Sequence, residues 1–272
     1  MIDLHLHTTA SDGALPPAAL VARAAAVGIT TLSVTDHDTT RGLDAARAAA
    51  VALGVSFVGG IEITAVASGR DVHVLGYFFD PSSTVLMEFL ARQQADRVRR
   101  VREMARRLAG LGAPIDPAPV VTEALEGGRS VGRPHVAAAL LAAGHVRTRE
   151  EAFTRFLEHG GPAFVPRRGA TPEDVIAMIT NAGGVTSLAH PGLAGIDALI
   201  PGLAAAGLHA LEARHTEHDA PTEARYRALA AELGLAVSGG SDFHDDTGRR
   251  TCGLGSVALS AADFAALEAK RR

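Results

Sequence analysis

Cysteine is almost missing from this sequence, which has one, Cys252, among 272 residues. A single cysteine excludes a framework of intramolecular disulfides and is typical of a reducing compartment. The first residues show neither the basic nor the apolar region of a secretory signal. No apolar run approaches the roughly 20 residues that a membrane-spanning helix needs. We therefore expect a cytoplasmic protein that has no membrane segment.

Excess positive charge is also missing, since the formal net charge is −4. Proteins that bind duplex nucleic acid usually carry a basic face, so this balance argues against a duplex-DNA binder but not against a small phosphorylated substrate. No Gly-x-x-x-x-Gly-Lys-Ser/Thr loop is present, which disfavours kinase or ATPase chemistry. No feature indicates an obligate protein partner. The length and the 47% hydrophobic content suffice for one domain, with or without an insertion.

Short β-branched runs alternate with alanine-rich, helix-like stretches along most of the chain. This rhythm favours an α/β fold with a parallel sheet, and about seven repeats favour closure into a barrel. The strands are expected at 2–5, 31–35, 57–61, 72–77, 185–189, 210–213 and 236–238. The helices are expected at 16–27, 43–53, 172–182, 196–206 and 221–233.

The alternation stops between 81 and 165, where no strand-like run is found. A long helical stretch at 87–108 opens this region and is rich in arginine. We expect a barrel domain formed by 1–80 and 166–272, interrupted by a helical insertion at 81–165. Two interpretations of the arginines stay open. They either contact nucleic acid or form a solvated helix face, with Asp96 and Glu103 as local ion-pair partners.

Histidines and carboxylates follow several of the expected strands. In α/β barrels the carboxyl ends of the strands carry the active site. Imidazole and carboxylate ligands gathered from many strand ends predict a metal site with more than one ion. The side chains concerned are His5, His7, Asp36, His37, Glu62, His73, His190, Asp242 and His244. A histidine pair such as His5 and His7 can alternatively be a buried, hydrogen-bonded pair. Asp12, from its spacing alone, is a turn residue before Gly13.

These motifs resemble, in order and through essentially the whole chain, the PHP (polymerase and histidinol phosphatase) family. They are His5-Leu6-His7, Ser11-Asp12-Gly13, Thr35-Asp36-His37-Asp38, Gly60-Ile61-Glu62, His73, Ala189-His190-Pro191 and Ser241-Asp242-Phe243-His244. The resemblance implies a distorted (β/α)7 barrel with a trinuclear metal site. It assigns His5, His7, Glu62 and Asp242 to one metal, Glu62, His73 and His190 to a second, and Asp12, His37 and His244 to a third. Asp36 would orient a ligand or place a proton.

A second group of motifs resembles the PHP subgroup of short nucleotide phosphoesterases. It comprises Val131-Gly132-Arg133-Pro134-His135-Val136, Phe164-Val165-Pro166 and Glu212-Ala213-Arg214-His215. The resemblance implies that Arg133 and His135 bind a substrate phosphate and that His215 contacts it from the barrel. The leaving oxygen needs a proton, which either His215 or a metal-bound water would supply, with Asp36 as a relay. From the residues alone, Arg133 could equally form a surface ion pair and His135 could cap a helix.

The resemblance implies an enzyme that hydrolyses the 3′-phosphate of nucleoside 3′,5′-bisphosphates such as pAp. The alternative is a 5′→3′ exoribonuclease acting on short 5′-phosphorylated RNA. Histidinol phosphatase and a non-catalytic PHP module are further alternatives. Three divalent ions are expected, manganese first, with iron or zinc also suited to oxygen and nitrogen ligands. The remaining histidines, His145, His159, His209 and His218, are assigned to surface or packing roles.

Overall fold

The computed structural model describes residues 1–126, 129–245 and 253–271, so Cys252 lies outside the described residues. The chain divides into two compact units, one formed by residues 1–88 and 170–272 and the other by residues 89–169. The sequence placed these boundaries at 80/81 and 165/166. None of the described helices is both long enough and apolar enough to cross a membrane.

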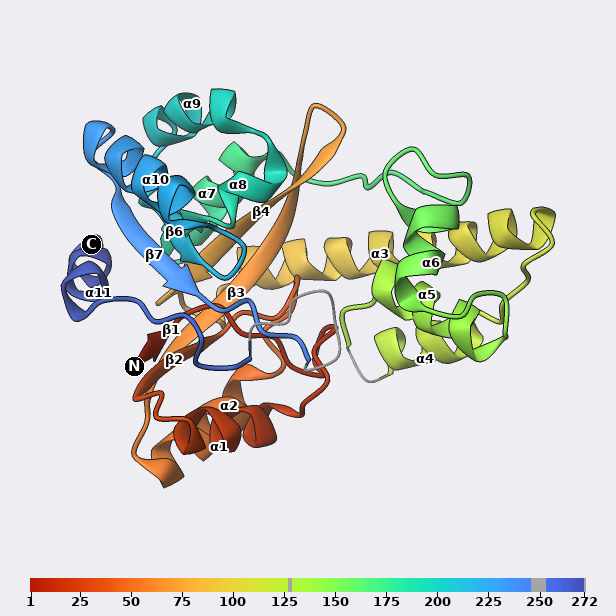
Figure 1. The fold of residues 1–272 in the computed structure, drawn as a ribbon, viewed down its shortest axis with the longest axis horizontal. Coiled ribbons are helices and arrows are strands. Elements are labelled where there is room, and N and C mark those ends of the chain that lie inside the picture. Colours follow the sequence, from red (N-terminus) through yellow and green to blue (C-terminus); the bar gives the residue numbers. More distant parts are fainter. Residues whose placement is uncertain (127–128, 246–252, 272) are drawn as a thin grey trace. The chain divides into compact units, whose positions relative to one another are not determined.

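The first unit contains a seven-stranded sheet whose spatial order follows the chain order (Figure 1). Its strands are β1 Ile2–Asp3, β2 Thr31–Val34, β3 Ser56–Ala67, β4 Arg70–Tyr77, β5 Val185–Leu188, β6 Ala210–His215 and β7 Ala236–Gly240. Just after β1, the Leu4 amide donates to the Gly239 carbonyl of β7 at 3.2 Å, and the Asp242 amide donates to the His5 carbonyl at 2.8 Å. The first and last strands therefore meet, which confirms the predicted seven-stranded, barrel-like fold.

The prediction of a parallel sheet is wrong for β4, which runs antiparallel to both β3 and β5. The physical reason is the two-residue turn at Ser68 and Gly69, which have φ values of 50° and 76°. A tight turn of this kind joins only antiparallel strands. Because of this reversal, His73 in the first half of β4 pairs with Thr64 of β3. Thr64 lies two residues after Glu62 on the same strand. His73 thus reaches the edge where the parallel strands end.

Helices surround the barrel: α1 Pro17–Ala26, α2 Leu43–Leu53, α7 Pro172–Asn181, α8 Pro191–Ala194, α9 Ile200–Ala205, α10 Ala220–Glu232 and α11 Ala261–Glu268. Helices α1 and α2 pack side by side on one part of the barrel wall (Figure 1). Helix α7 begins as the sequence indicates, because the Thr171 hydroxyl accepts from the Asp174 amide and Pro172 occupies the first turn. The single helix expected at 196–206 is instead a 3-10 turn, Asp197–Leu199, followed by α9. Pro201 lies in the first turn of α9, the position in a helix that proline tolerates.

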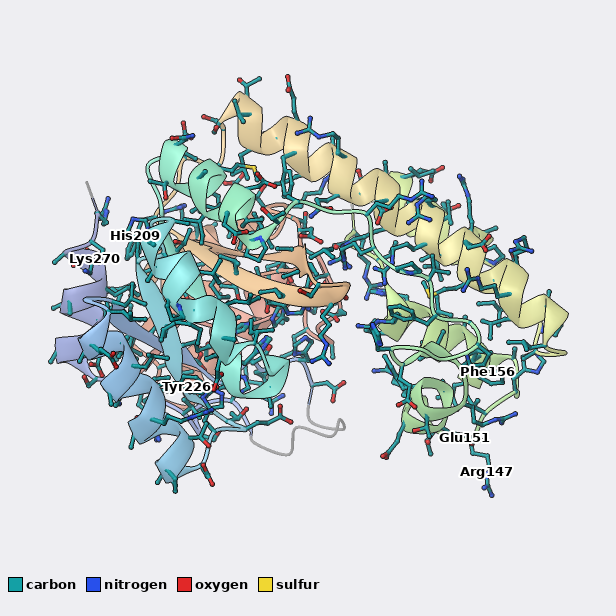
Figure 2. All side chains as sticks on the ribbon, turned by 90° about the horizontal axis from the view of Figure 1, so that it is seen from above. Arg147, Glu151, Phe156, His209, Tyr226 and Lys270 are labelled. Atoms are coloured by element: carbon teal, nitrogen blue, oxygen red, sulfur yellow. The ribbon has the colours of Figure 1, made fainter. Side chains whose placement is uncertain are left out.

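The second unit is helical and has a hydrophobic core of its own. Its elements are most of α3 Thr84–Gly110, α4 Ala118–Leu125, α5 Arg133–Ala142, α6 Arg149–Ala152 and a π-helical turn, Phe153–Leu157. Val101, Met104 and Leu108 of α3 pack in one buried cluster with Leu140 and Phe156. Phe156 is labelled in Figure 2. Of the arginines of α3, Arg92, Arg102 and Arg106 are exposed. Arg97 and Arg100 are instead buried, and they donate to the carbonyls of Val131 and Val165.

Candidate metal centre

Four buried side chains form the first group of potential metal ligands. Their donor atoms lie within 4.8 Å of one another and belong to His5, His7, Glu62 and Asp242. The Nε2 atom of His5 is 3.3 Å from Glu62 Oε2 and 3.3 Å from Asp242 Oδ1. The Nε2 atom of His7 is 3.2 Å and 3.1 Å from the same two oxygens. Two ligand atoms each about 2.1 Å from one ion would be roughly 3.0–3.4 Å apart at octahedral or tetrahedral angles.

The buried polar atoms of this group lack the hydrogen-bond partners that a folded protein normally provides. Within the described part of the chain, His5 Nε2, both ring nitrogens of His7 and Glu62 Oε2 are buried without a hydrogen bond of acceptable geometry. Orphaned buried polar atoms are uncommon and costly. Here they converge on one another at ligand-to-ligand distances. The donor set therefore fits a divalent cation better than it fits a network of direct hydrogen bonds.

Glu62 connects this group to the next one, because its two carboxylate oxygens face different histidines. Its Oε1 is 2.8 Å from His73 Nδ1 and 3.1 Å from His190 Nε2. Its Oε2 is 3.0 Å from His37 Nδ1. Burial opposes ionisation of this carboxyl, but the nearby rings of His37, His73 and His5 outweigh burial and hold the pKa well below its usual range. Glu62 is thus an ionised carboxylate that belongs to two of the donor groups.

A third group surrounds Asp12, which the spacing alone had suggested to be a turn residue. The Oδ1 atom of Asp12 is 3.4 Å from His244 Nε2 and 3.8 Å from His37 Nε2, and His7 lies in the same group. Burial raises the pKa of Asp12, yet the His37 and His244 rings bring it well below its usual value. Burial lowers the pKa of His37 to about 4, so that ring is neutral near pH 7 and can offer a lone pair.

Asp36 organises the loop that carries Asp12. Its Oδ1 accepts from the Thr8 amide at 2.8 Å and from the Ser11 hydroxyl at 2.6 Å, and its Oδ2 accepts from the Thr8 hydroxyl at 2.7 Å. Burial raises the pKa of Asp36. These contacts hold the loop that follows β1 in a bent conformation. They favour a positioning role for Asp36, whereas its role as a proton relay stays a prediction.

The backbone is strained at three points around the site. Asp38, His190 and Asp242 have φ values of 50°, 28° and 52°. Non-glycine residues rarely adopt this region, and the strain tends to collect at functional sites. Asp38 is held there because its Oδ1 accepts from the Thr64 amide at 2.9 Å while its own amide donates to the Glu62 carbonyl at 2.9 Å. The chain therefore turns sharply just where the ligands must converge.

Glu212 of β6 is a functional residue that the sequence quoted in a motif but gave no role. It is fully buried, its Oε1 is 2.9 Å from His5 Nδ1, and its Oε2 accepts from the His190 amide at 2.8 Å. Burial lowers the pKa of His5, but the carboxylates of Glu212 and Glu62 outweigh burial and raise it to about 10. Glu212 thus fixes the His5 ring so that Nε2 faces the first group. A lone carboxylate inside an apolar strand was the available signal.

We expect Glu212→Gln to weaken metal binding by roughly 10–100-fold, the usual effect of losing a partner that orients a metal-ligating histidine. Isothermal titration with Mn²⁺ measures the affinity, and activity measured against Mn²⁺ concentration provides a second readout. Excess Mn²⁺ should restore much of the lost activity, which a purely structural defect would not allow. An unchanged Mn²⁺ affinity would rule out this positioning role.

His215 lies beside the first group. Its Nδ1 accepts from the Glu217 amide at 3.1 Å, so the neutral ring carries its proton on Nε2, which is 3.4 Å from Asp242 Oδ2.

Arg133 and His135 belong to the second unit, in the first turn of α5. The His135 Nδ1 accepts from the Gly132 amide at 3.2 Å, a helix-capping contact, and the Arg133 guanidinium lies 6.0 Å and 5.7 Å from the rings of Phe153 and Phe164.

The packing role predicted for His218 agrees with its burial. Its Nδ1 contacts the Ala213 carbonyl at 2.9 Å and its Nε2 accepts from the Gly192 amide at 3.2 Å. These bonds tie the start of α8, next to His190, to β6. His209, which directly precedes β6 (Figure 2), contacts Thr186 through Nδ1 and belongs to none of the three donor groups. His145 and His159 belong to the second unit and to none of the three donor groups.

Three comparisons with known proteins all find PHP-domain proteins or phosphoesterases. Residues 3–122 match the PHP domain. The chain is 34% identical over 250 residues to the 3′,5′-nucleoside bisphosphate phosphatase of Chromobacterium violaceum, covering 89% of this chain and 87% of that protein. It is 35% identical over 249 residues to the 5′-3′ exoribonuclease Rnm of Escherichia coli, covering 89% and 84%. A crystal structure from Bifidobacterium adolescentis, assigned as a metal-dependent phosphoesterase, superposes with a TM-score of 0.90 at 33% identity, covering 100% of this chain and 96% of that one.

Proposed function

The chain belongs to the PHP family, as its motifs predicted, and we propose that it is a phosphoric ester hydrolase that removes the 3′-phosphate from nucleoside 3′,5′-bisphosphates. The products are the 5′-nucleotide and phosphate. One observation supports the proposal above the others: three overlapping groups of histidine and carboxylate donors share Glu62, His7 and His37. A relative with this named activity covers most of the chain.

Three divalent ions would occupy the site. The first would be held by His5, His7, Glu62 and Asp242, the second by Glu62, His73 and His190, and the third by Asp12, His37 and His244. The donor groups of the structure add His37 to the second set and His7 to the third. His190 is in none of these groups, although its Nε2 lies 3.1 Å from Glu62 Oε1. Nitrogen and oxygen donors of this kind suit manganese, with iron or zinc as alternatives. Divalent ions, when bound, lower the pKa of water towards neutrality and neutralise charge on phosphoryl oxygens.

The remaining chemistry falls to groups of the chain itself. Hydrolysis leaves an oxygen on the nucleoside that needs a proton, and His215 would donate it as an imidazolium from Nε2, which faces Asp242 of the first donor group. Arg133 would bind the 5′-phosphate through its fork of N–H donors, with His135 beside it. Asp36 would keep the Asp12 loop in place, and Glu212 would keep the His5 ring in place.

The second candidate function is 5′→3′ hydrolysis of short 5′-phosphorylated RNA. It requires the same metal chemistry, because the ester bond that is cleaved again joins phosphorus to a 3′-oxygen. The relative from Escherichia coli carries this name, and its identity to the chain equals that of the phosphatase within one percentage point. The metal centre therefore supports both candidates, and the difference must come from how much of an RNA chain the protein can bind.

Phosphate release with Mn²⁺ tests the proposal on four substrates: adenosine 3′,5′-bisphosphate, a 5′-phosphorylated dinucleotide, 5′-AMP and histidinol phosphate. Rapid release from the bisphosphate, with 5′-AMP left intact, supports the proposed function. Faster cleavage of the dinucleotide moves the assignment to the exoribonuclease. If the metal-loaded protein leaves all four intact, the proposal is refuted.

We expect Arg133→Ala to raise the KM for adenosine 3′,5′-bisphosphate by roughly 10–100-fold while kcat changes little, since a charge-assisted pair contributes about 1.5–3 kcal/mol. Adenosine 3′-monophosphate lacks the 5′-phosphate, so its KM should change far less. Arg155→Ala is a matched control, because Arg155 is exposed in the same unit and pairs with Glu151 at 2.7 Å. An equal loss on both substrates would show that Arg133 does not recognise the 5′-phosphate.

A further inference from the structure

A hollow of about 760 Å³ lies in the second unit, outside every residue assigned to hydrolysis. One side of it is formed by α3 and another by residues 165–168. Arginines dominate the lining, which consists of Ala95, Val98, Arg99, Arg102, Glu103, Arg106, Arg107, Leu125, Val165, Pro166 and Arg168. A volume of this size falls within the usual range for ligand sites.

Ion pairs inside the hollow neutralise only part of its positive charge. Glu103 is shared by Arg106, at 2.7 Å, and Arg107, at 3.1 Å. Hydrogen bonds from these two arginines lower the pKa of Glu103 to about 2, so it is ionised at any physiological pH. Five arginines thus face a single lining carboxylate.

The remaining arginines leave the hollow strongly cationic. Arg99 pairs with Asp96 at 2.7 Å, and Asp96 is not part of the lining. For Arg102 and Arg168, which are both exposed, the described part of the chain provides no ion-pair partner. Among the described side chains, Asp96 and Glu103 together compensate two of the five lining arginines, which leaves three positive charges.

The charge of the whole unit agrees with that of the hollow. Residues 89–169 contain 14 arginines and eight acidic residues, a net charge of +6, while the rest of the chain carries −10. The overall charge of −4 therefore conceals a basic helical unit. A positive field of this kind concentrates polyanions and raises their association rates.

The geometry of the arginines identifies the type of anion. Arg99, Arg102 and Arg106 follow one another at helical spacing and span about 10 Å of α3, which is longer than a single phosphate group. Guanidinium forks match phosphate oxygens well. The lining contains no aromatic ring and no amide side chain that could read a base edge, and its apolar part is Ala95, Val98, Leu125, Val165 and Pro166. Binding would therefore depend on the backbone of a nucleic acid and not on its sequence.

We infer that this hollow binds the sugar-phosphate backbone of single-stranded RNA, and that RNA chains are bound more tightly than mononucleotides as a result. The inference rests on the proposed function for its biological meaning, since it widens the substrate range from nucleoside bisphosphates to RNA. It does not rest on that function for its physical basis. The arginines would bind a single strand whether or not the metal centre hydrolyses it.

Fluorescence anisotropy of the full metal-loaded chain tests this inference, with a single-stranded oligoribonucleotide protected by phosphorothioate linkages. We expect Arg102→Ala/Arg168→Ala to raise the Kd by about tenfold, and Arg102→Lys/Arg168→Lys to raise it much less. If about three phosphates are neutralised, the logarithm of the association constant should fall with the logarithm of the salt concentration at a slope near −2. In the Arg102→Ala/Arg168→Ala variant the magnitude of that slope should be smaller by about 1.

The matched control is Arg147→Ala/Arg149→Ala, which removes the same charge from the same unit. Both side chains are exposed, and Arg147 extends from the surface outside the hollow (Figure 2). Its Kd for RNA should equal that of the wild type. An equal loss in the two variants, tighter binding of duplex RNA, or preference for a poly-aspartate peptide would each overturn the inference.

Hydrolysis by the wild-type chain separates this inference from the proposed function. If adenosine 3′,5′-bisphosphate is not hydrolysed but RNA binds with the expected salt dependence, the proposed function is wrong and the inference that the hollow binds RNA is kept. If the bisphosphate is hydrolysed but Arg102→Ala/Arg168→Ala binds RNA like the wild type, the inference about the hollow is wrong and the proposed function is kept.

Discussion

Glu62→Gln is expected to abolish hydrolysis and to remove most of the bound metal. Glu62 offers Oε2 to His5, His7 and His37 and Oε1 to His73 and His190, so one side chain completes two of the proposed sites. Glutamine keeps the shape but loses the charge and replaces one donor oxygen by an amide nitrogen that does not bind metal. We expect kcat/KM to fall by at least about a thousandfold, equivalent to roughly 4 kcal/mol of transition-state stabilisation.

Elemental analysis of the purified variant measures the metal content beside the activity. Asp242→Ala is the informative comparison, because Asp242 completes only the first site. It should abolish activity while keeping more metal than Glu62→Gln does. Glu232→Gln changes an exposed glutamate of α10 in the same way and should change neither quantity. Full metal content together with full activity in Glu62→Gln would refute the bridging role.

Strand positions were predictable because buried strands leave a strong local signal. All seven expected strands are present, and apart from the end of the third strand their bounds lie within two or three residues of the predicted ones. Strand direction was less accessible. The sequence analysis ended the third strand at 61, whereas β3 continues to Ala67 and returns through Ser68-Gly69 as β4. Ser68-Gly69 is a turn signal, but the alternation of strands and helices elsewhere in the sequence favoured parallel strands, and the turn was not recognised.

Members of the donor groups could be predicted only where they form a short motif in the sequence. His5 and His7 or Asp242 and His244 can be recognised from neighbours in the sequence, but Asp12 needed the family resemblance because its spacing suits a turn equally well. Glu212 received no role because it acts through a contact across 207 positions, to the Nδ1 atom of His5. Such a contact has no local pattern. Tertiary structure alone shows that a buried carboxylate in β6 orients a ring that follows β1.

Removing the metal should destabilise the barrel strongly. Without cations, the carboxylates of Asp12, Glu62 and Asp242 and the five histidine rings of the donor groups are crowded together, and several of their buried polar atoms lack a hydrogen bond. A ligand that binds only the folded state stabilises it by about 4 kcal/mol at a thousand times its Kd. For a chain of this size, each kcal/mol shifts the Tm by roughly 2–4 °C. We expect saturating Mn²⁺ to raise the Tm of the chelator-treated protein by about 10 °C.

This shift should depend on pH in a defined direction. Metal ligands must lose their protons, and the pKa of His5, raised to about 10, means that a proton already competes for that ring near neutrality. Lowering the pH favours the proton further, so the Mn²⁺-induced shift should be smaller at about pH 6 than at about pH 8. Thermal scans with and without Mn²⁺ at both values measure it. In Glu62→Gln the shift should shrink at both pH values, and an equal shift in that variant would mean that the stabilising ions bind elsewhere.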